Sequence, residues 1–164
     1  MGRAFIFGDA IDTDVLAPGH LMKLEPDALA AHCLEAVDPA FARKVKPGDV
    51  VVAGRSFGIG SSREQAAVSL KRLGVSVLAV SFARIFYRNA INVGLAVAPF
   101  AQAAEIAAGD ELEVDLSRGR IADLTTGKTY SIAPLPDNVL AMVRDGGLIP
   151  HLKARLAAER DPRK

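Results

Sequence analysis

The sequence predicts an α/β domain built on a parallel sheet. Two continuous apolar runs, residues 50–53 and 75–80, are typical of buried strands, and segments of helical periodicity alternate with them. Parallel strands need crossover connections, which helices usually provide. The chain has 164 residues, and this length predicts a single domain over residues 1–164, because domains commonly hold about 100 to 200 residues.

The N-terminal part begins with a short apolar run, residues 3–7, that predicts a strand ending at Gly8–Asp9. A turn-rich segment, residues 12–20, follows it. Apolar residues then recur with helical spacing over residues 29–37, and Asp38–Pro39 is expected to end this helix. The strand at 50–53 comes next.

A glycine-rich loop, residues 54–65, leads into the next helix. Ser61 is followed three residues later by Glu64, which matches the capping box and predicts Ser61 as the N-cap. Gly74 is the expected C-terminal cap. The pattern then predicts a strand over 75–80, a helix over 83–92 that ends near Gly94, and a strand over 95–97.

The C-terminal part changes character. Alternating and short apolar segments predict further strands over 111–116, 121–124 and 129–132, and helices over 137–144 and 150–160.

Charge and cysteine content exclude several classes of protein. The chain has 20 Lys and Arg against 19 Asp and Glu, so no basic surface for nucleic acid or anionic membranes is expected. A single cysteine, Cys33, excludes a disulfide framework and an all-cysteine metal site held by this chain alone. With no signal-peptide pattern and no apolar run of about 18 residues, we expect a soluble cytoplasmic protein.

The loop before Glu64 carries the strongest chemical signal. Its glycines, including Gly58 and Gly60, let backbone N–H groups approach a ligand, and a helix N-terminus favours an anion. Arg55 and Arg63 are candidate carboxylate clamps. The spacing fits neither a P-loop nor a dinucleotide fingerprint, so nucleotide binding is disfavoured.

A serine at this position has two interpretations. Ser61 or Ser62 could lose a proton, because the same positive field would stabilise an alkoxide. Ser61 could equally be only an N-cap. The local pattern alone leaves both open.

Three motifs together resemble the small subunit of 3-isopropylmalate dehydratase, in the aconitase superfamily. They are Asp12–Thr13–Asp14, Ser56 to Ala66 and Ser81 to Leu95, and their order matches the family over most of residues 5–100. The resemblance implies a swivelling β/β/α domain like the mobile last domain of aconitase. It also implies a large-subunit partner that carries a [4Fe-4S] cluster, with none bound by this chain alone.

The resemblance also implies roles for individual residues. Ser61 matches the serine that takes a proton from carbon, Arg63 matches an arginine that binds a substrate carboxylate, and Ser62 would assist. Asp14 falls where the superfamily has an aspartate at the active-site mouth, which could orient a partner side chain or be a turn residue.

Substrate choice in this family is associated with a short loop that aligns with His20–Leu21–Met22–Lys23. Met22 is apolar and suits an alkyl substituent, which favours 3-isopropylmalate or a methylated malate over a homoaconitate-type substrate. Lys23 could instead reach a second carboxylate or remain solvated.

Further candidates and a rival function remain. We expect His32 and Cys33 to pack within a helix, and Arg84, Arg88, Asn89 and Asn92 to serve backbone groups or the subunit contact.

The rival to an enzyme subunit is a non-catalytic module that binds a carboxylate or phosphate through the glycine-rich loop.

Overall fold

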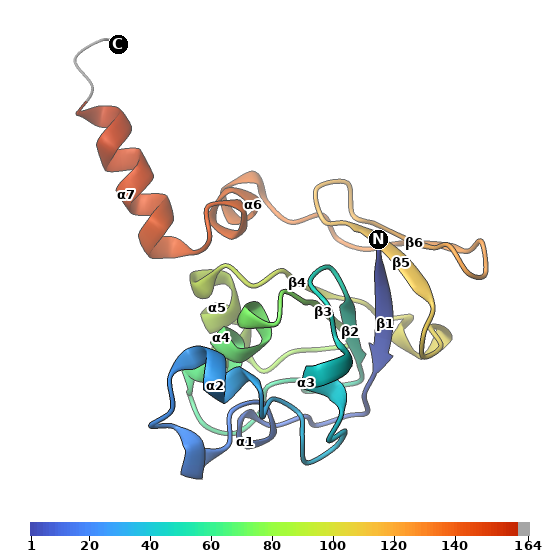
Figure 1. Ribbon diagram of the computed structural model, residues 1–164. Helices are drawn as coiled ribbons and strands as arrows, with labels where there is room; N and C mark the ends of the chain where they lie inside the picture. Colours follow the sequence, from blue (N-terminus) through green and yellow to red (C-terminus); the bar gives the residue numbers. More distant parts are fainter. Residues whose placement is uncertain (161–164) are drawn as a thin grey trace.

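A curled seven-stranded sheet forms the centre of the computed structural model, which describes residues 1–160 (Figure 1). The strands lie in the order β4-β3-β2-β1-β5-β6-β7. The parallel part is β1 (Gly2–Ile6), β2 (Val50–Ala53), β3 (Ser76–Ala79) and β4 (Val97–Pro99). The antiparallel part is β5 (Glu111–Asp115), β6 (Arg120–Asp123) and β7 (Thr129–Ser131), and it joins the rest through β1. The expected α/β class is confirmed.

Strand β2 is buried on both faces because the sheet separates two cores. Val51 packs into the core under the helices, whereas Val50 and Val52 pack into the core on the opposite face. Successive side chains of a strand point to opposite faces, so a continuous apolar run is the sequence that this position requires.

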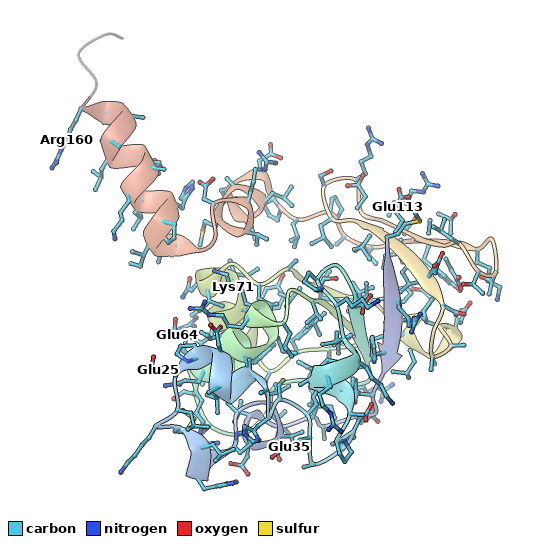
Figure 2. All side chains as sticks on the ribbon, viewed as in Figure 1. Glu25, Glu35, Glu64, Lys71, Glu113 and Arg160 are labelled. Carbon is cyan, nitrogen blue, oxygen red and sulfur yellow. The ribbon has the colours of Figure 1, made fainter. Side chains whose placement is uncertain are left out.

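Five helices cover the first face, and their apolar side chains complete its core (Figure 1). They are α1 (Thr13–Leu16), α2 (Pro26–Ala30), α3 (Phe41–Lys44), α4 (Glu64–Arg72) and α5 (Arg84–Val93). The second core is closed by Phe100, by the segment around the 3₁₀ helix Ala103–Glu105, and by β5 to β7 of the curled sheet. Charged side chains such as Glu25, Glu64 and Glu113 are exposed on the surface (Figure 2).

Two helices follow the sheet, α6 (Asp137–Arg144) and α7 (Leu148–Glu159), and α7 extends away from it (Figure 1). The expected break between them is present, since Gly146 and Gly147 have φ values of 89° and 124°. None of the helices in residues 1–160 has the length and apolar character needed to cross a membrane.

The long helix expected over residues 29–37 is wrong. The helix ends at Ala30, and turns follow up to Val37, so His32 and Cys33 lie in turns. Leu34 has a φ of 61°, and its N–H donates to the carbonyl of Val15 at 3.0 Å. A tertiary hydrogen bond therefore replaces the helical one, and the local spacing could not reveal it.

Two local expectations near α4 have opposite outcomes. The assignment of Ser61 as N-cap is wrong, because α4 begins at Glu64 with Arg63 as its N-cap and no side-chain cap. Gly74, with a φ of 74°, does follow the end of α4, as expected. Smaller shifts affect residues 12–20, which form α1 and the 3₁₀ helix Gly19–Leu21, and the strand expected at 95–97, which is Val97–Pro99.

Candidate active site

The glycine-rich loop lies directly beside the segment that precedes α1. The N–H of Gly58 donates to the carbonyl of Ile11 at 2.7 Å, and the N–H of Thr13 donates to the carbonyl of Ile59 at 2.8 Å. These bonds form a short parallel bridge between Asp12 and Ile59. Two motifs that are distant in sequence are thereby joined into one site.

Ser61 is exposed, yet it is fixed by a buried neighbour. Thr13 is only 2% exposed, and its Oγ1 accepts a hydrogen bond from the Ser61 N–H at 3.0 Å. The same Oγ1 lies 3.2 Å from the Ser61 Oγ. The Ser61 side chain is thus held on one side by protein while the other side faces solvent.

An open cavity of about 610 Å³ adjoins Ser61. The loop and α5 supply its walls: Gly58, Gly60, Ser61, Ala83, Arg84, Ile85 and Arg88. Arg84 and Arg88 are four positions apart, which places both on one face of α5. Within residues 1–160 no carboxylate pairs with either guanidinium, so the cavity beside Ser61 carries positive charge.

The loop geometry needs glycine at two positions. Gly58 has a φ of 83°, and a Cβ there would lie 2.1 Å from Cγ of Phe86. Gly60 has a φ of 109°, and a Cβ there would lie 3.0 Å from the Thr13 Oγ1. A side chain at Gly58 would strike the core under α5, and one at Gly60 would crowd the hydroxyl that holds Ser61.

Arg63 is oriented by Asp14, one of the two arrangements that the sequence left open. The Arg63 Nη1 donates to the Asp14 Oδ1 at 2.9 Å and to the carbonyl of Ala17 at 3.2 Å. The N–H of Gly19 donates to the same Asp14 oxygen at 2.8 Å. The pKa of the Asp14 carboxyl lies below its ordinary value, mainly because of the Gly19 N–H and next because of the Arg63 guanidinium. Asp14 therefore stays charged beside Arg63.

The other candidates in the loop lie farther from this cavity. The Ser62 carbonyl accepts a hydrogen bond from the Asn89 Nδ2 at 3.2 Å, which ties the loop to α5. The Arg55 N–H donates to the Asp9 Oδ1 at 2.7 Å, and Arg55 lines a separate cavity of about 370 Å³. Arg55 is therefore not among the residues that line the cavity at Ser61, and its role as a carboxylate clamp stays a prediction.

The four residues expected to choose the substrate do not line the cavity at Ser61. His20 and Lys23 are exposed, and Leu21 and Met22 are half-buried against the core under the helices. The segment approaches the site through Gly19, where a Cβ would lie 3.1 Å from the Arg63 Nη2. The loop therefore borders Arg63 and not Ser61.

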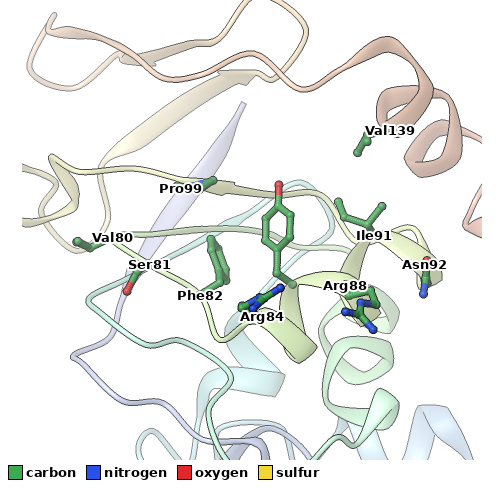
Figure 3. A pocket seen from close by; sticks show the side chains of 10 residues that line it. Val80, Ser81, Phe82, Arg84, Arg88, Ile91, Asn92, Pro99 and Val139 are labelled. Carbon is green, nitrogen blue, oxygen red and sulfur yellow. The ribbon is translucent and has the colours of Figure 1, made fainter.

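A second, more apolar cavity of about 590 Å³ lies against α5 (Figure 3). Phe82, Ile91, Pro99 and Val139 contribute apolar walls, with Val139 coming from α6. Arg84 and Arg88 line this cavity as well as the one at Ser61. The two cavities thus share Arg84 and Arg88 as lining residues.

Nothing in residues 1–160 fits a metal cluster. These residues contain no group of three His, Cys, Asp or Glu side chains placed to hold a metal ion. Cys33 is fully buried, and burial raises the pKa of its thiol, whereas a cysteine ligand must be a thiolate.

Sequence reasoning did not assign a role to Thr13, and for Arg84 and Arg88 it favoured backbone or subunit-contact roles over a catalytic one. The four-residue spacing of the two arginines was a usable signal that they share a helix face. Thr13 gave no such signal, because its contact with Ser61 spans 48 positions.

Comparison with known proteins identifies the family of this chain. A family model described as the aconitase C-terminal domain matches residues 22–103. The 3-isopropylmalate dehydratase small subunit of Pyrobaculum calidifontis is 52% identical over 158 residues, covering 94% of this chain and 97% of that protein. The methanogen homoaconitase small subunit of Methanothermobacter thermautotrophicus is 50% identical over 152 residues, covering 92% and 88%.

A solved structure has the same fold as this chain. The crystal structure of 3-isopropylmalate dehydratase from Methanocaldococcus jannaschii matches with a TM-score of 0.90 and 44% identity, covering 96% of this chain and 95% of that one. The resemblance seen in the sequence is confirmed. The chain belongs to the aconitase C-terminal domain family, among the small subunits of 3-isopropylmalate dehydratase and related hydro-lyases.

Proposed function

We propose that this chain is the small subunit of a hydro-lyase that interconverts 2-isopropylmalate and 3-isopropylmalate by dehydration and rehydration, a step of leucine biosynthesis in the cytoplasm. The names of its relatives support this, since proteins 47% and 52% identical are named 3-isopropylmalate dehydratase small subunits. The observation that carries the proposal is Ser61, held by buried Thr13 at the edge of a cavity lined by Arg84 and Arg88.

A small subunit acts with a large one, so half of the active site lies on another chain. The proposal assigns a [4Fe-4S] cluster to that large subunit, because residues 1–160 offer no ligand set for it. When bound, such a cluster supplies a Lewis acid for the departing hydroxyl group. This chain supplies the base and carboxylate ligands.

Ser61 is the proposed base. A serine hydroxyl is a weak base at its ordinary pKa, so its alkoxide must be stabilised by nearby donors and cations. Arg84 and Arg88 supply that positive charge in the shared cavity. Ser61 takes a proton from the substrate carbon, the electron pair of that C–H bond forms the C=C bond, and the hydroxyl leaves the neighbouring carbon with the electron pair of its C–O bond. On rehydration hydroxide adds to the first carbon, and Ser61 returns the proton to the neighbouring carbon.

Arg63 is the proposed ligand for a substrate carboxylate. Its Nη1 is occupied by Asp14 and by the Ala17 carbonyl. A guanidinium has five N–H donors, so the Nη2 and Nε groups remain for a bidentate carboxylate. The exposed Ser62 hydroxyl next to Arg63 would add a further donor.

The substrate class follows from Met22 and from the relatives. Met22 is apolar and half-buried, so this position offers no partner for an extra carboxylate and suits an alkyl group. A relative named for homoaconitase is 50% identical, which makes a tricarboxylic substrate the alternative to test. A non-catalytic carboxylate-binding module is disfavoured, because the relatives are named as dehydratase subunits.

The test is anaerobic purification of the tagged chain with its bound partner from its source cells, followed by a substrate panel. We expect a stoichiometric second protein that contains iron and sulfide, and turnover of 2- and 3-isopropylmalate. Each chain assayed alone is the control and should be inactive. Preferred turnover of homoaconitate-type substrates would replace the isopropylmalate assignment, and a partnerless chain that only binds carboxylates would overturn the enzyme assignment.

A further inference from the structure

The buried hydroxyl of Thr13 contacts the exposed Ser61. Thr13 is 2% exposed and stands at the first position of α1, between two aspartates with separate structural tasks. The Asp12 carboxylate accepts from the Val15 N–H at 2.9 Å as the helix cap, and Asp14 orients Arg63. Within residues 1–160, both hydrogen-bond contacts of the Thr13 hydroxyl are to Ser61.

The protons in this contact can be counted. A threonine hydroxyl has one donor and two acceptor positions. The Thr13 Oγ1 already accepts from the Ser61 N–H at 3.0 Å, so its own proton is free to point along the 3.2 Å line to the Ser61 Oγ. While Ser61 is neutral, either hydroxyl can donate. Once Ser61 has lost its proton, only Thr13 can donate.

We propose that Thr13 is a positioning residue that fixes the Ser61 side chain and donates a hydrogen bond to its oxygen when that oxygen is anionic. This inference rests on the proposed function, in which Ser61 is the base. A hydrogen bond to an anion is roughly twice as strong as one between neutral groups, so the contact stabilises the alkoxide more than the alcohol. It thereby makes Ser61 a competent base.

The surroundings of the pair suit this role. Gly60 leaves room for the Thr13 hydroxyl, since a Cβ at Gly60 would approach it to 3.0 Å. The burial of Thr13 keeps water from competing for its proton. The charged groups around Ser61 are Arg84 and Arg88 from α5, the Arg63–Asp14 pair, Glu64 at the start of α4, and Asp12, whose carboxylate accepts from the Val15 N–H.

The experiment uses the two-subunit complex carrying Thr13→Val, which removes the hydroxyl at similar volume, and Thr13→Ser, which keeps it. With Thr13→Val we expect kcat to fall about 10- to 100-fold while KM stays unchanged, because a hydrogen bond to a charged group is lost. The rising limb of the kcat–pH profile should move to higher pH by about 1 to 2 units. Thr13→Ser should keep most of kcat and the wild-type pH profile.

A double-mutant cycle separates this role from a structural one. In a Ser61→Ala background, Thr13→Val should cause no further loss of residual turnover, because the group it serves is gone. An additive loss, or a fall in kcat with an unmoved pH profile, would mean that Thr13 only supports the fold. Thr13→Val could fail to assemble with the large subunit, and Thr13→Ser is then the test. If the kcat of Thr13→Ser were as low as that of Ser61→Ala, the inference would be wrong.

The inference and the proposed function fail in different ways. If Ser61→Ala keeps full activity, the assignment of Ser61 as base is wrong, and the role of Thr13 falls with it. If Ser61→Ala is inactive while Thr13→Val matches the wild type, the base assignment stands and the inference about Thr13 alone is wrong.

Discussion

The Arg63 guanidinium donates to the Asp14 carboxylate at 2.9 Å, although the two residues are 49 positions apart in the chain. Asp14 belongs to α1, and Arg63 is the N-cap of α4. The pair therefore joins α1 to the loop that carries Ser61. An arginine held in this way keeps the rest of its N–H donors in a fixed direction, which lowers the entropic cost of binding a carboxylate.

Replacing Asp14 with asparagine should loosen Arg63. We expect KM for the di-acid substrate to rise about 2- to 5-fold with little change in kcat, because an exposed ion pair contributes little energy and acts mainly on orientation. Steady-state kinetics of the complex measure this. Asp27→Asn is the matched control, since Asp27 also pairs with an arginine, Arg72 at 3.5 Å, but away from the site. Equal effects of the two changes would contradict the role of Asp14.

The same pair has a defined pH dependence. The pKa of Asp14 is lowered in the folded chain, so its carboxylate is charged above the ordinary aspartate value of about 3.9. The pairing with Arg63 is lost only as the pH falls through the lowered folded pKa. Asp14 stays ionised from about pH 5 to about pH 9. Over this range KM should therefore depend on pH in the same way in the wild type and in Asp14→Asn. A step in that range that disappears in the variant would show that Asp14 titrates there.

Ser61→Ala should abolish most turnover of the complex. We expect kcat to fall by at least about 10²- to 10⁴-fold, the usual contribution of a positioned base, while the iron content stays unchanged. Kinetics and an iron assay on the same preparation check both points. Ser62→Ala, one residue away, should lose much less kcat and is the control. Full activity of Ser61→Ala would remove Ser61 from the mechanism.

Gly58→Ala should destabilise the fold by more than backbone strain alone. The φ of 83° costs an alanine about 1 kcal/mol, and the approach of its Cβ to Phe86 at 2.1 Å should add about 1 to 3 kcal/mol of overpacking. Gly109→Ala is the control, because Gly109 has a φ of 89° but a Cβ there would meet no atom of residues 1–160 within 4 Å. Thermal denaturation should show a lower Tm for Gly58→Ala. Equal losses of Tm in Gly58→Ala and Gly109→Ala would mean that the Phe86 side chain moves aside at no cost in stability.

Met22→Arg should shift substrate preference toward an extra carboxylate. Met22 is half-buried beside the helices, and an arginine could lay its stem along that surface and extend its guanidinium. We expect the ratio of kcat/KM for a homoaconitate-type substrate to that for isopropylmalate to rise about tenfold. Met22→Leu is the control and should leave the ratio unchanged. A constant ratio in Met22→Arg would exclude Met22 from substrate choice.

The outcome at the helix ends shows what local sequence can predict. Gly74 and Gly94 end α4 and α5 in left-handed conformations, with φ values of 74° and 81°, as the sequence predicted. Those positions depend on glycine's freedom within a few residues of chain. The buried strand at residues 50–53 was predictable for a similarly local reason, because its apolar run matches burial on both faces.

The wrong predictions came from contacts between residues that are distant in sequence. The helix expected over 29–37 breaks because the Leu34 N–H bonds to Val15, and Ser61 is not a cap because Thr13 engages both its N–H and its hydroxyl. Arg55 and Arg63 look equivalent in the loop, yet Arg63 bonds to Asp14 whereas Arg55 lines a separate cavity. No local pattern contains these contacts.

The sequence by itself determined the α/β class through its periodicity, and its three motifs identified the family, which in turn implies Ser61 as the candidate base. Only the tertiary structure decided how Ser61 is held, which arginines share its cavity and which residue orients Arg63. The physical reason is that strand and helix signals are local, whereas an active site is made where crossovers bring separate loops together at one edge of the sheet.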